Sequence, residues 1–93
     1  MTLIEFDAAK SADNVRKRGI GFERFAEMDL DRAISVEDTR KDYGEQRLRV
    51  LGDINGLLHA AVITPRGDRI RVISLRRANR REERAYAKER QSS

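Results

Sequence analysis

The feature that most constrains this chain is an Asn-Gly pair at positions 55 and 56, between two stretches rich in apolar residues. Asn-Gly is the preferred sequence of a two-residue type I′ turn, because both central residues need a positive φ. The residues before the pair alternate in character, Leu48, Val50 and Ile54 against Arg47, Arg49 and Asp53. This period of two predicts a strand with one buried face. We therefore predict an antiparallel hairpin that pairs residues 47–54 with residues 57–64.

The residues that follow extend the hairpin into a meander. Leu57–Ile63 is almost entirely apolar, which predicts the central strand of the sheet. Pro65-Arg66-Gly67-Asp68 contains the residues that favour a turn. Arg69–Leu75 then alternates again, with arginines at 69 and 71 opposite apolar residues at 70 and 72. We predict three consecutive antiparallel strands with a basic, solvated face.

The first half of the chain predicts two helices and two further strands. Asp7 is a favourable N-cap for a helix over Ala8–Arg18, and Gly19 is a suitable stop. In that helix Ala8, Ala12 and Val15 share one face, which we expect to be apolar and buried. A strand is predicted over Thr2–Phe6. Phe22, Phe25, Ala26 and Met28 have the spacing of a second, shorter helix, whose aromatic residues we expect in the core. A strand over Ala33–Val36 and a polar loop over Glu37–Glu45 follow.

The end of the chain predicts one more helix. Asn79 is a favourable cap for a helix over Arg80–Arg90, whose apolar face is limited to Ala85 and the ring of Tyr86. Residues 91–93 are expected to form a frayed tail. The order of elements predicts an α+β fold, a twisted antiparallel sheet with helices on one face. Ninety-three residues suit a single domain over 1–93.

Composition excludes several classes of chemistry. Cysteine is absent and histidine occurs once, so a disulfide, a thiolate nucleophile and a cysteine-ligated zinc are excluded, and we expect no metal site or cofactor. No apolar run approaches the roughly 20 residues of a membrane span, and Met1-Thr2-Leu3 does not begin a signal peptide. We expect a cytoplasmic protein with no membrane partner, whose chemistry uses Arg, Lys, Glu, Tyr, Ser or His59.

The net charge of +4 hides a gradient along the chain. Residues 1–45 carry 8 basic and 11 acidic side chains, whereas residues 46–93 carry 12 basic and 5 acidic ones. Eleven of those 12 cations are arginine, whose planar fork matches phosphate and carboxylate oxygens. Such a surface favours a polyanionic partner. The alternative is a set of ordinary solvated arginines, and composition does not separate the two.

Four arginines of the predicted strands suggest an RNA-binding trough. Arg47, Arg49, Arg69 and Arg71 alternate on strands that flank the central one, and we expect them to share a face with His59. Phosphates suit this surface, because each neutralised phosphate releases counterions. The alternatives are arginines paired with nearby carboxylates, and a His59 that is purely structural.

The last helix concentrates groups that suit RNA cleavage. Arg80, Glu83 and Arg84 lie one turn apart, so Glu83 can position an arginine, while Tyr86 can stack or donate a proton. RNA cleavage needs activation of a 2′-hydroxyl, stabilisation of the charge at phosphorus and protonation of the leaving oxygen, for which these groups suffice without a metal. The alternative is a surface helix with ordinary ion pairs.

Several ordered motifs cover the chain from Ile4 to Tyr86. They are Phe6-Asp7-x-x-Lys10-x-x-x-Asn14-x-x-Lys17-x-Gly19-Ile20-x-Phe22, then Glu45-Gln46-Arg47, then Arg66-Gly67-Asp68-Arg69-Ile70-Arg71-Val72-Ile73-Ser74-x-Arg76-x-Ala78, then Arg80-Arg81-Glu82-Glu83-Arg84-x-Tyr86. In these motifs the chain resembles the BrnT toxin family. Two positions depart from the family pattern: Arg18 stands where a histidine is common, and Gly21 where a Ser or Thr cap is usual.

The resemblance implies a RelE-like fold and a ribonuclease that halts growth by blocking translation. It also implies neutralisation by a BrnA-type antitoxin, expected as a 2:2 heterotetramer, and a type II toxin–antitoxin operon whose promoter DNA is bound through the antitoxin. RNA is the expected substrate, on or off the ribosome.

The motif positions supply the candidate site. From them we expect Arg71, Arg76 and Arg80 to act as phosphate and transition-state clamps, and Lys10, Lys17, Glu83 and Tyr86 as acid–base candidates. Arg47, Arg49, Arg69, His59 and Ser74 are the expected RNA-binding residues. The alternative function is a non-catalytic nucleic-acid-binding or adaptor subunit of an autoregulatory complex, although no helix-turn-helix is visible.

Overall fold

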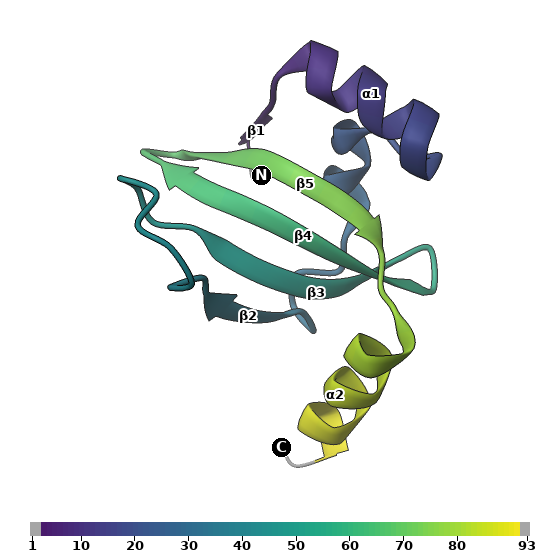
Figure 1. The fold of residues 1–93 in the computed structure, drawn as a ribbon. Coiled ribbons are helices and arrows are strands. Elements are labelled where there is room, and N and C mark those ends of the chain that lie inside the picture. The colour runs from purple at the N-terminus through teal and green to yellow at the C-terminus, as the bar shows by residue number, and fades with distance from the viewer. Residues whose placement is uncertain (1–2, 92–93) are drawn as a thin grey trace.

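The computed structural model describes residues 3–91 and shows an α+β fold built on one five-stranded sheet (Figure 1). The strands are β1 (Leu3–Glu5), β2 (Ile34–Glu37), β3 (Leu48–Ile54), β4 (Leu57–Arg66) and β5 (Arg69–Arg77). The helices are α1 (Ala8–Arg18), the 3₁₀ helix η1 (Phe22–Glu27) and α2 (Arg80–Gln91). Gln91 therefore belongs to α2 rather than to a tail, and the predictions for residues 1–2 and 92–93 lie outside the described residues.

The sheet has the strand order β1-β5-β4-β3-β2, with β4 at its centre as predicted. The chain reverses at Asn55-Gly56, where both residues have positive φ, 52° and 82°, and Ile54 pairs with Leu57. This is the predicted type I′ hairpin. The second turn is shorter than predicted, because β4 runs on through Pro65 and only Gly67 and Asp68 separate it from β5.

The sheet is mixed, which corrects the predicted antiparallel one. Strands β2 to β5 are antiparallel to their neighbours, but β1 pairs parallel to β5, with Leu3 opposite Arg69. The hairpins follow from local turn residues, whereas a three-residue strand that pairs with a segment more than 60 residues away depends on long-range packing.

One face of the sheet carries the hydrophobic core. Phe22 and Phe25 of η1, with Met28, pack against Val72 and Leu75 of β5 and the inward residues of β3 and β4. The predicted second helix is a 3₁₀ helix. Such a helix has three residues per turn, which fits the spacing of three between Phe22, Phe25 and Met28. The two aromatic residues are buried, as predicted.

Helix α1 begins and ends at the predicted residues but packs through a different face. Asp7 caps it, and Gly19 ends it with a φ of 75°. Ala8, Ala12 and Val15 are exposed, whereas Ser11 is buried. The Ser11 hydroxyl accepts a hydrogen bond from the Phe22 N–H at 2.9 Å, and the Asn14 amide donates to the Leu75 carbonyl at 2.7 Å. Polar contacts therefore anchor α1, and the hydrophobic pattern alone gave the wrong face.

The prediction that all helices pack on one face is wrong for α2: α1 and η1 contact the sheet on its core face, and the other face stays open. In Figure 1 α1 lies with η1, which passes behind the sheet, while α2 projects from the end of β5 on its own. No helix within residues 3–91 is long and apolar enough to cross a membrane.

Candidate functional site

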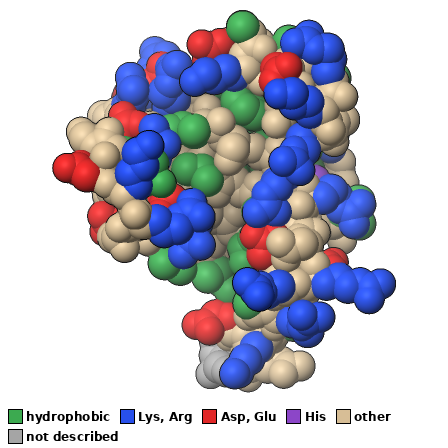
Figure 2. Space-filling view, viewed as in Figure 1, with side chains coloured by type: hydrophobic (Ala, Val, Ile, Leu, Met, Phe, Trp, Pro, Cys, Tyr) green, Lys and Arg blue, Asp and Glu red, His purple; other side chains and the backbone are tan. Residues whose placement is uncertain are grey.

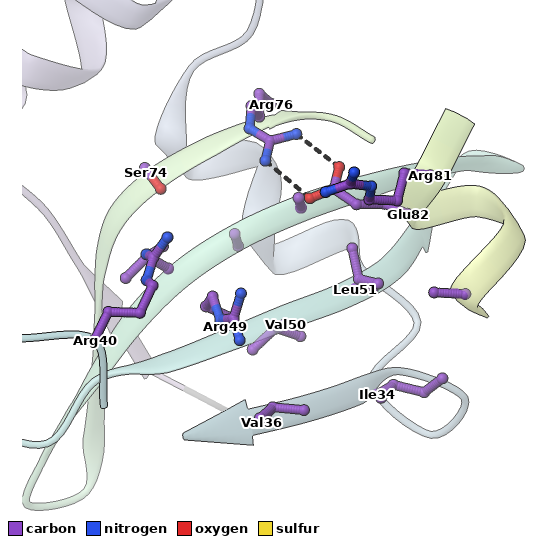
Figure 3. Close-up of a pocket in the computed structure, with 14 residues that line it drawn as sticks. Ile34, Val36, Arg40, Arg49, Val50, Leu51, Ser74, Arg76, Arg81 and Glu82 are labelled. Carbon is purple, nitrogen blue, oxygen red and sulfur yellow. Dashed lines mark hydrogen bonds and ion pairs between the residues drawn. The ribbon is translucent and has the colours of Figure 1, made fainter. Parts of the chain in front are cut away.

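The open face of the sheet holds a cleft with a volume of about 520 Å³. Its floor is formed by β3, β4 and β5, one wall by β2 and the loop after it, and the other by α2 (Figure 3). Figure 2 looks onto this face, where Lys and Arg side chains surround a hollowed area with hydrophobic side chains. The cleft residues that carry charge are Arg40, Arg49, Arg76, Arg81 and Glu82.

Arg76, at the end of β5, is fixed by Glu82 of α2. The guanidinium donates from Nη1 and Nη2 to the two carboxylate oxygens of Glu82, at 2.8 and 2.9 Å. This bidentate hydrogen bond raises the pKa of Arg76 and lowers the pKa of Glu82. Both groups are therefore charged at neutral pH, and the arginine is held in one orientation in the cleft.

Glu82 also caps the helix that carries it. Its carboxylate accepts a hydrogen bond from the Asn79 N–H, while the Asn79 side chain accepts one from the Glu82 N–H, both at 2.9 Å. This reciprocal pair is a capping box, which satisfies two backbone donors at the start of α2. Asn79 is thus the predicted cap. The same carboxylate connects the start of α2 to Arg76 on the sheet.

Arg40 stands on the opposite wall and is fixed in a similar way. Its guanidinium donates to both oxygens of Asp38, at 2.9 and 2.8 Å, and the Tyr43 hydroxyl donates to the same carboxylate at 3.3 Å. The Asp38 side chain is only 1% exposed. The hydrogen bonds from Arg40 hold the pKa of Asp38 well below its usual range, and the pKa of Arg40 is raised in turn. A buried carboxylate thus anchors a charged, exposed guanidinium.

Two further arginines of the cleft are not held by a carboxylate in the described part of the chain. Arg49 on β3 and Arg81 on α2 form no ion pair or side-chain hydrogen bond with any residue from 3 to 91. Their guanidinium groups are therefore available to an external anion. Between them the cleft has an apolar lining, formed on the floor by Leu51, Ala60 and Val62 and on the walls by Ile34, Val36 and Ala85.

This arrangement suits a strand of nucleic acid. Guanidinium groups without an ion pair bind phosphate oxygens, and an apolar floor accommodates unstacked bases. A group of His, Asp or Glu side chains able to hold a metal ion does not occur among residues 3–91.

Comparison with protein families agrees with this chemistry. The model described as "Ribonuclease toxin, BrnT, of type II toxin-antitoxin system" matches residues 6–82. The chain belongs to this family. The resemblance inferred from the sequence motifs is thereby confirmed, and the family of this chain is one of ribonuclease toxins. No curated protein matches the chain.

Within this BrnT-family fold, the structure divides the predicted site residues into three groups. Arg49, Ser74 and Arg76 line the cleft. Lys10, Arg47 and Arg71 line a smaller hollow beside it. The remaining predicted residues line neither: Lys17, His59, Arg69, Arg80, Glu83 and Tyr86.

Three of the residues that line neither depression have other partners in the structure. His59 is 5% exposed and points to the core face with Ala61, where its Nδ1 lies 2.7 Å from the Leu57 carbonyl oxygen. The predicted shared face with the arginines is therefore wrong, because the parity of His59 places it on the opposite side of β4. Lys17 pairs with Asp13 at 2.9 Å. The Tyr86 hydroxyl donates to the Arg32 carbonyl at 3.0 Å, which ties α2 to the segment before β2.

Sequence reasoning missed three charged residues of the cleft: Arg40, Arg81 and Glu82. Glu82 had a signal, because Asn79 followed three residues later by Glu is a capping-box pattern. Adjacent helical residues point in directions 100° apart, so Glu82 and Glu83 cannot face the same partner. The structure shows that Glu82 faces Arg76. Arg40 had no comparable signal, since its position depends on how the loop after β2 folds over Asp38.

Proposed function

We propose that the cleft is the active site of a metal-independent endoribonuclease, and that this chain is a toxin that inhibits translation by cutting RNA. The observation that carries the proposal is the convergence of Arg49 and Arg81, neither in an ion pair with residues 3–91, with an Arg76 that Glu82 holds in place. Family membership supports the ribonuclease reaction.

The chemistry of the cleft is charge stabilisation. When a 2′-hydroxyl attacks the adjacent phosphorus, negative charge accumulates on the non-bridging oxygens and then on the departing 5′ oxygen. Arg49 and Arg81 can bind the phosphate, while Arg76 is already oriented before substrate arrives, which avoids reorganisation during the reaction. Both oxygens of Glu82 are occupied by Arg76, so we assign Glu82 a positioning role.

The acid–base candidates from the sequence remain proposals of a weaker kind. Lys10 lines the neighbouring hollow, and Lys17, Glu83 and Tyr86 lie outside both depressions. Arg71 and Arg80 likewise stand away from the cleft, so neither supports the clamp role expected of it. We favour the cleft residues because they share one surface.

Regulation would follow from the same surface. We propose that a BrnA-type antitoxin, in a 2:2 complex that contacts promoter DNA through the antitoxin, blocks the cleft with an acidic or amphipathic segment. Partner and RNA would then compete for one set of arginines. The proposed RelE-like arrangement rests on the open sheet face flanked by α2.

RNA cleavage by the purified protein in the presence of a chelator tests this proposal. The variant is Arg49→Ala/Arg81→Ala, and its control is Arg16→Ala/Arg32→Ala, which removes the same charge from exposed positions outside the cleft. We expect the cleft variant to lose at least about 100-fold in cleavage rate, and the control to retain activity. If wild type binds RNA without cutting it, the chain is a binding or adaptor subunit instead.

A further inference from the structure

A second, smaller hollow lies beside the cleft, where the β4–β5 hairpin meets the start of α1. Its volume is about 170 Å³. Four cations from four segments line it, Lys10 of α1, Arg47 before β3, Arg66 of β4 and Arg71 of β5, together with the carboxylates of Asp7 and Glu45. We call this depression the basic hollow.

The two carboxylates that line the basic hollow offset the charge of its four cations only in part. Asp7 is occupied as the cap of α1, where hydrogen bonds from the N–H groups of Lys10 and Ala9 lower its pKa. Glu45 is shared between Arg47 and Arg66, at 3.3 and 3.4 Å. The Lys10 ammonium makes no ion pair or side-chain hydrogen bond within residues 3–91.

The ion pairs that do exist are weak ones. Arg71 contacts Glu5 of β1 at 3.5 Å, and this contact, like the two pairs of Glu45, is long and only partly buried. Long ion pairs that water still reaches add little stability, because water screens the two charges. An arriving phosphate, which accepts shorter charge-assisted hydrogen bonds, can therefore replace them.

Strand β5 connects the basic hollow to the cleft. Ile73 lines the hollow, and the next residue, Ser74, lines the cleft. A register shift lies here, because Val72 pairs with Ile63 whereas Ser74 pairs with Val62.

This irregularity decides which way the arginines of β5 point. Arg71 and Arg76 are five residues apart and would face opposite sides of a regular strand. Their partners on β4, Thr64 and Ala60, are four residues apart and share a face. Cross-strand partners point the same way, so the bulge brings both Arg71 and Arg76 to the open face. Their backbone positions are about 13 Å apart along the strand, from a rise of about 3.3 Å for each of four residues of β4.

We propose that the basic hollow is a second phosphate-binding subsite, which holds the RNA strand beyond the segment that is cut in the cleft. This inference rests on the proposed function. It makes RNA length a determinant of affinity: a strand long enough to reach Lys10 and Arg66 binds cations that a short strand does not reach.

Binding of uncleavable 2′-O-methyl oligoribonucleotides of two lengths, measured by fluorescence anisotropy at several salt concentrations, tests the proposal. The probes are a trinucleotide and a strand of about 12 nucleotides, within the range of single-stranded sites. The variant is Lys10→Ala/Arg66→Ala. The control, Arg16→Ala/Arg32→Ala, removes equal charge from exposed positions outside both depressions. Thermal unfolding verifies that all proteins fold.

We expect the hollow variant to bind the long strand about tenfold more weakly, with a salt slope reduced by about 0.7 for each phosphate that is no longer neutralised. The trinucleotide should bind wild type and variant equally. Unchanged affinity and slope for the long strand would overturn the proposal. So would a variant that binds long RNA normally but loses affinity for the antitoxin, because the hollow would then belong to the protein partner. Either result leaves the cleft untouched, since cleavage by Arg49→Ala/Arg81→Ala reports on it separately.

Discussion

The two faces of this sheet are made by the same strands but use their residues differently. On the covered face, Phe22, Phe25 and Leu75 are buried in an apolar core. On the open face, Val36 is 52% exposed and arginines stand over a shallow apolar floor. Successive residues of a strand point to opposite faces, so residues of the two sets are neighbours in the sequence. One set of alternate positions supports stability, and the other carries the cleft.

The comparison shows how a chain with 39% charged residues can still fold. The core is confined to one face, where burial supplies most of the stability. The open face then carries charged groups held by partners from other elements, Glu82 for Arg76 and Asp38 for Arg40. Substitutions on the covered face should therefore change stability first, and those on the open face should change activity first.

The largest expected effect is on the covered face. Phe25→Ala removes a side chain that is 1% exposed, and we expect it to lower the free energy of unfolding by about 3–5 kcal/mol. Val36→Ala on the open face should change it by less than about 0.5 kcal/mol. Chemical denaturation measures both, and equal losses would remove the distinction between the faces.

The next effect concerns the positioning of Arg76. Glu82→Gln removes the charge that holds the guanidinium, and we expect kcat for RNA cleavage to fall about 100-fold with KM nearly unchanged. Two controls separate this role from folding. Glu89→Gln changes an exposed residue of the same helix outside both depressions and should leave kcat unchanged, while Asn79→Ala should cost about 1 kcal/mol of stability with kcat retained. A parallel fall of kcat in Asn79→Ala would mean that Glu82 acts only through the helix cap.

A smaller effect tests how tightly the covered face is packed. A Cβ on Gly52 would lie 2.7 Å from Met28 side-chain atoms and 3.1 Å from the Ala33 Cβ. Because the Met28 side chain can move, we expect Gly52→Ala to cost about 1–3 kcal/mol without unfolding the protein. Ser74→Ala, on the open face, is the stability control, and thermal unfolding of the two variants should differ clearly.

The smallest effect is the pH dependence that comes from Glu82. Its pKa is lowered from the usual value of 4.5 by the hydrogen bond from Arg76. A group with a depressed pKa stabilises the folded state above its unfolded value and loses that contribution as pH falls through the folded one. Wild type should therefore lose stability relative to Glu82→Gln as the pH drops below about 4.5. If the denaturation midpoints of wild type and Glu82→Gln fall in parallel as the pH is lowered, the ion pair makes no contribution to stability.

Much of the fold was predictable because it is set by local sequence. Asp7 and Gly19 bound α1, and Asn55-Gly56 fixes the central hairpin, since each acts through its own backbone conformation. The parallel pairing of β1 and the exposed side of α1 were not predictable in this way. They depend on contacts such as Asn14 with Leu75, which join segments distant in the sequence.

The site was predictable only in part, for the same physical reason. Strand alternation placed Arg49 correctly, and the family motifs brought in Ser74 and Arg76. The expectation that His59 shares the face of the arginines was wrong, because alternation along β4 gives His59 the parity of the core residues Ala61 and Ile63. On α2 the motif gave the correct segment, but the phase of the helix decides that Arg81 and Glu82 face the cleft. The rotation of α2 about its axis and the path of the loop after β2 are set by their contacts with the folded sheet, so the local sequence does not determine them.

The central claim, that RNA is bound by the open face, is tested most directly by photocrosslinking. A 2′-O-methyl strand containing 4-thiouridine is bound to the purified protein, irradiated, and the linked residues are identified by mass spectrometry. We predict adducts in β3, β5 and α2, around Arg49, Ser74 and Arg81. Adducts concentrated on η1, which covers the opposite face of the sheet, would contradict it.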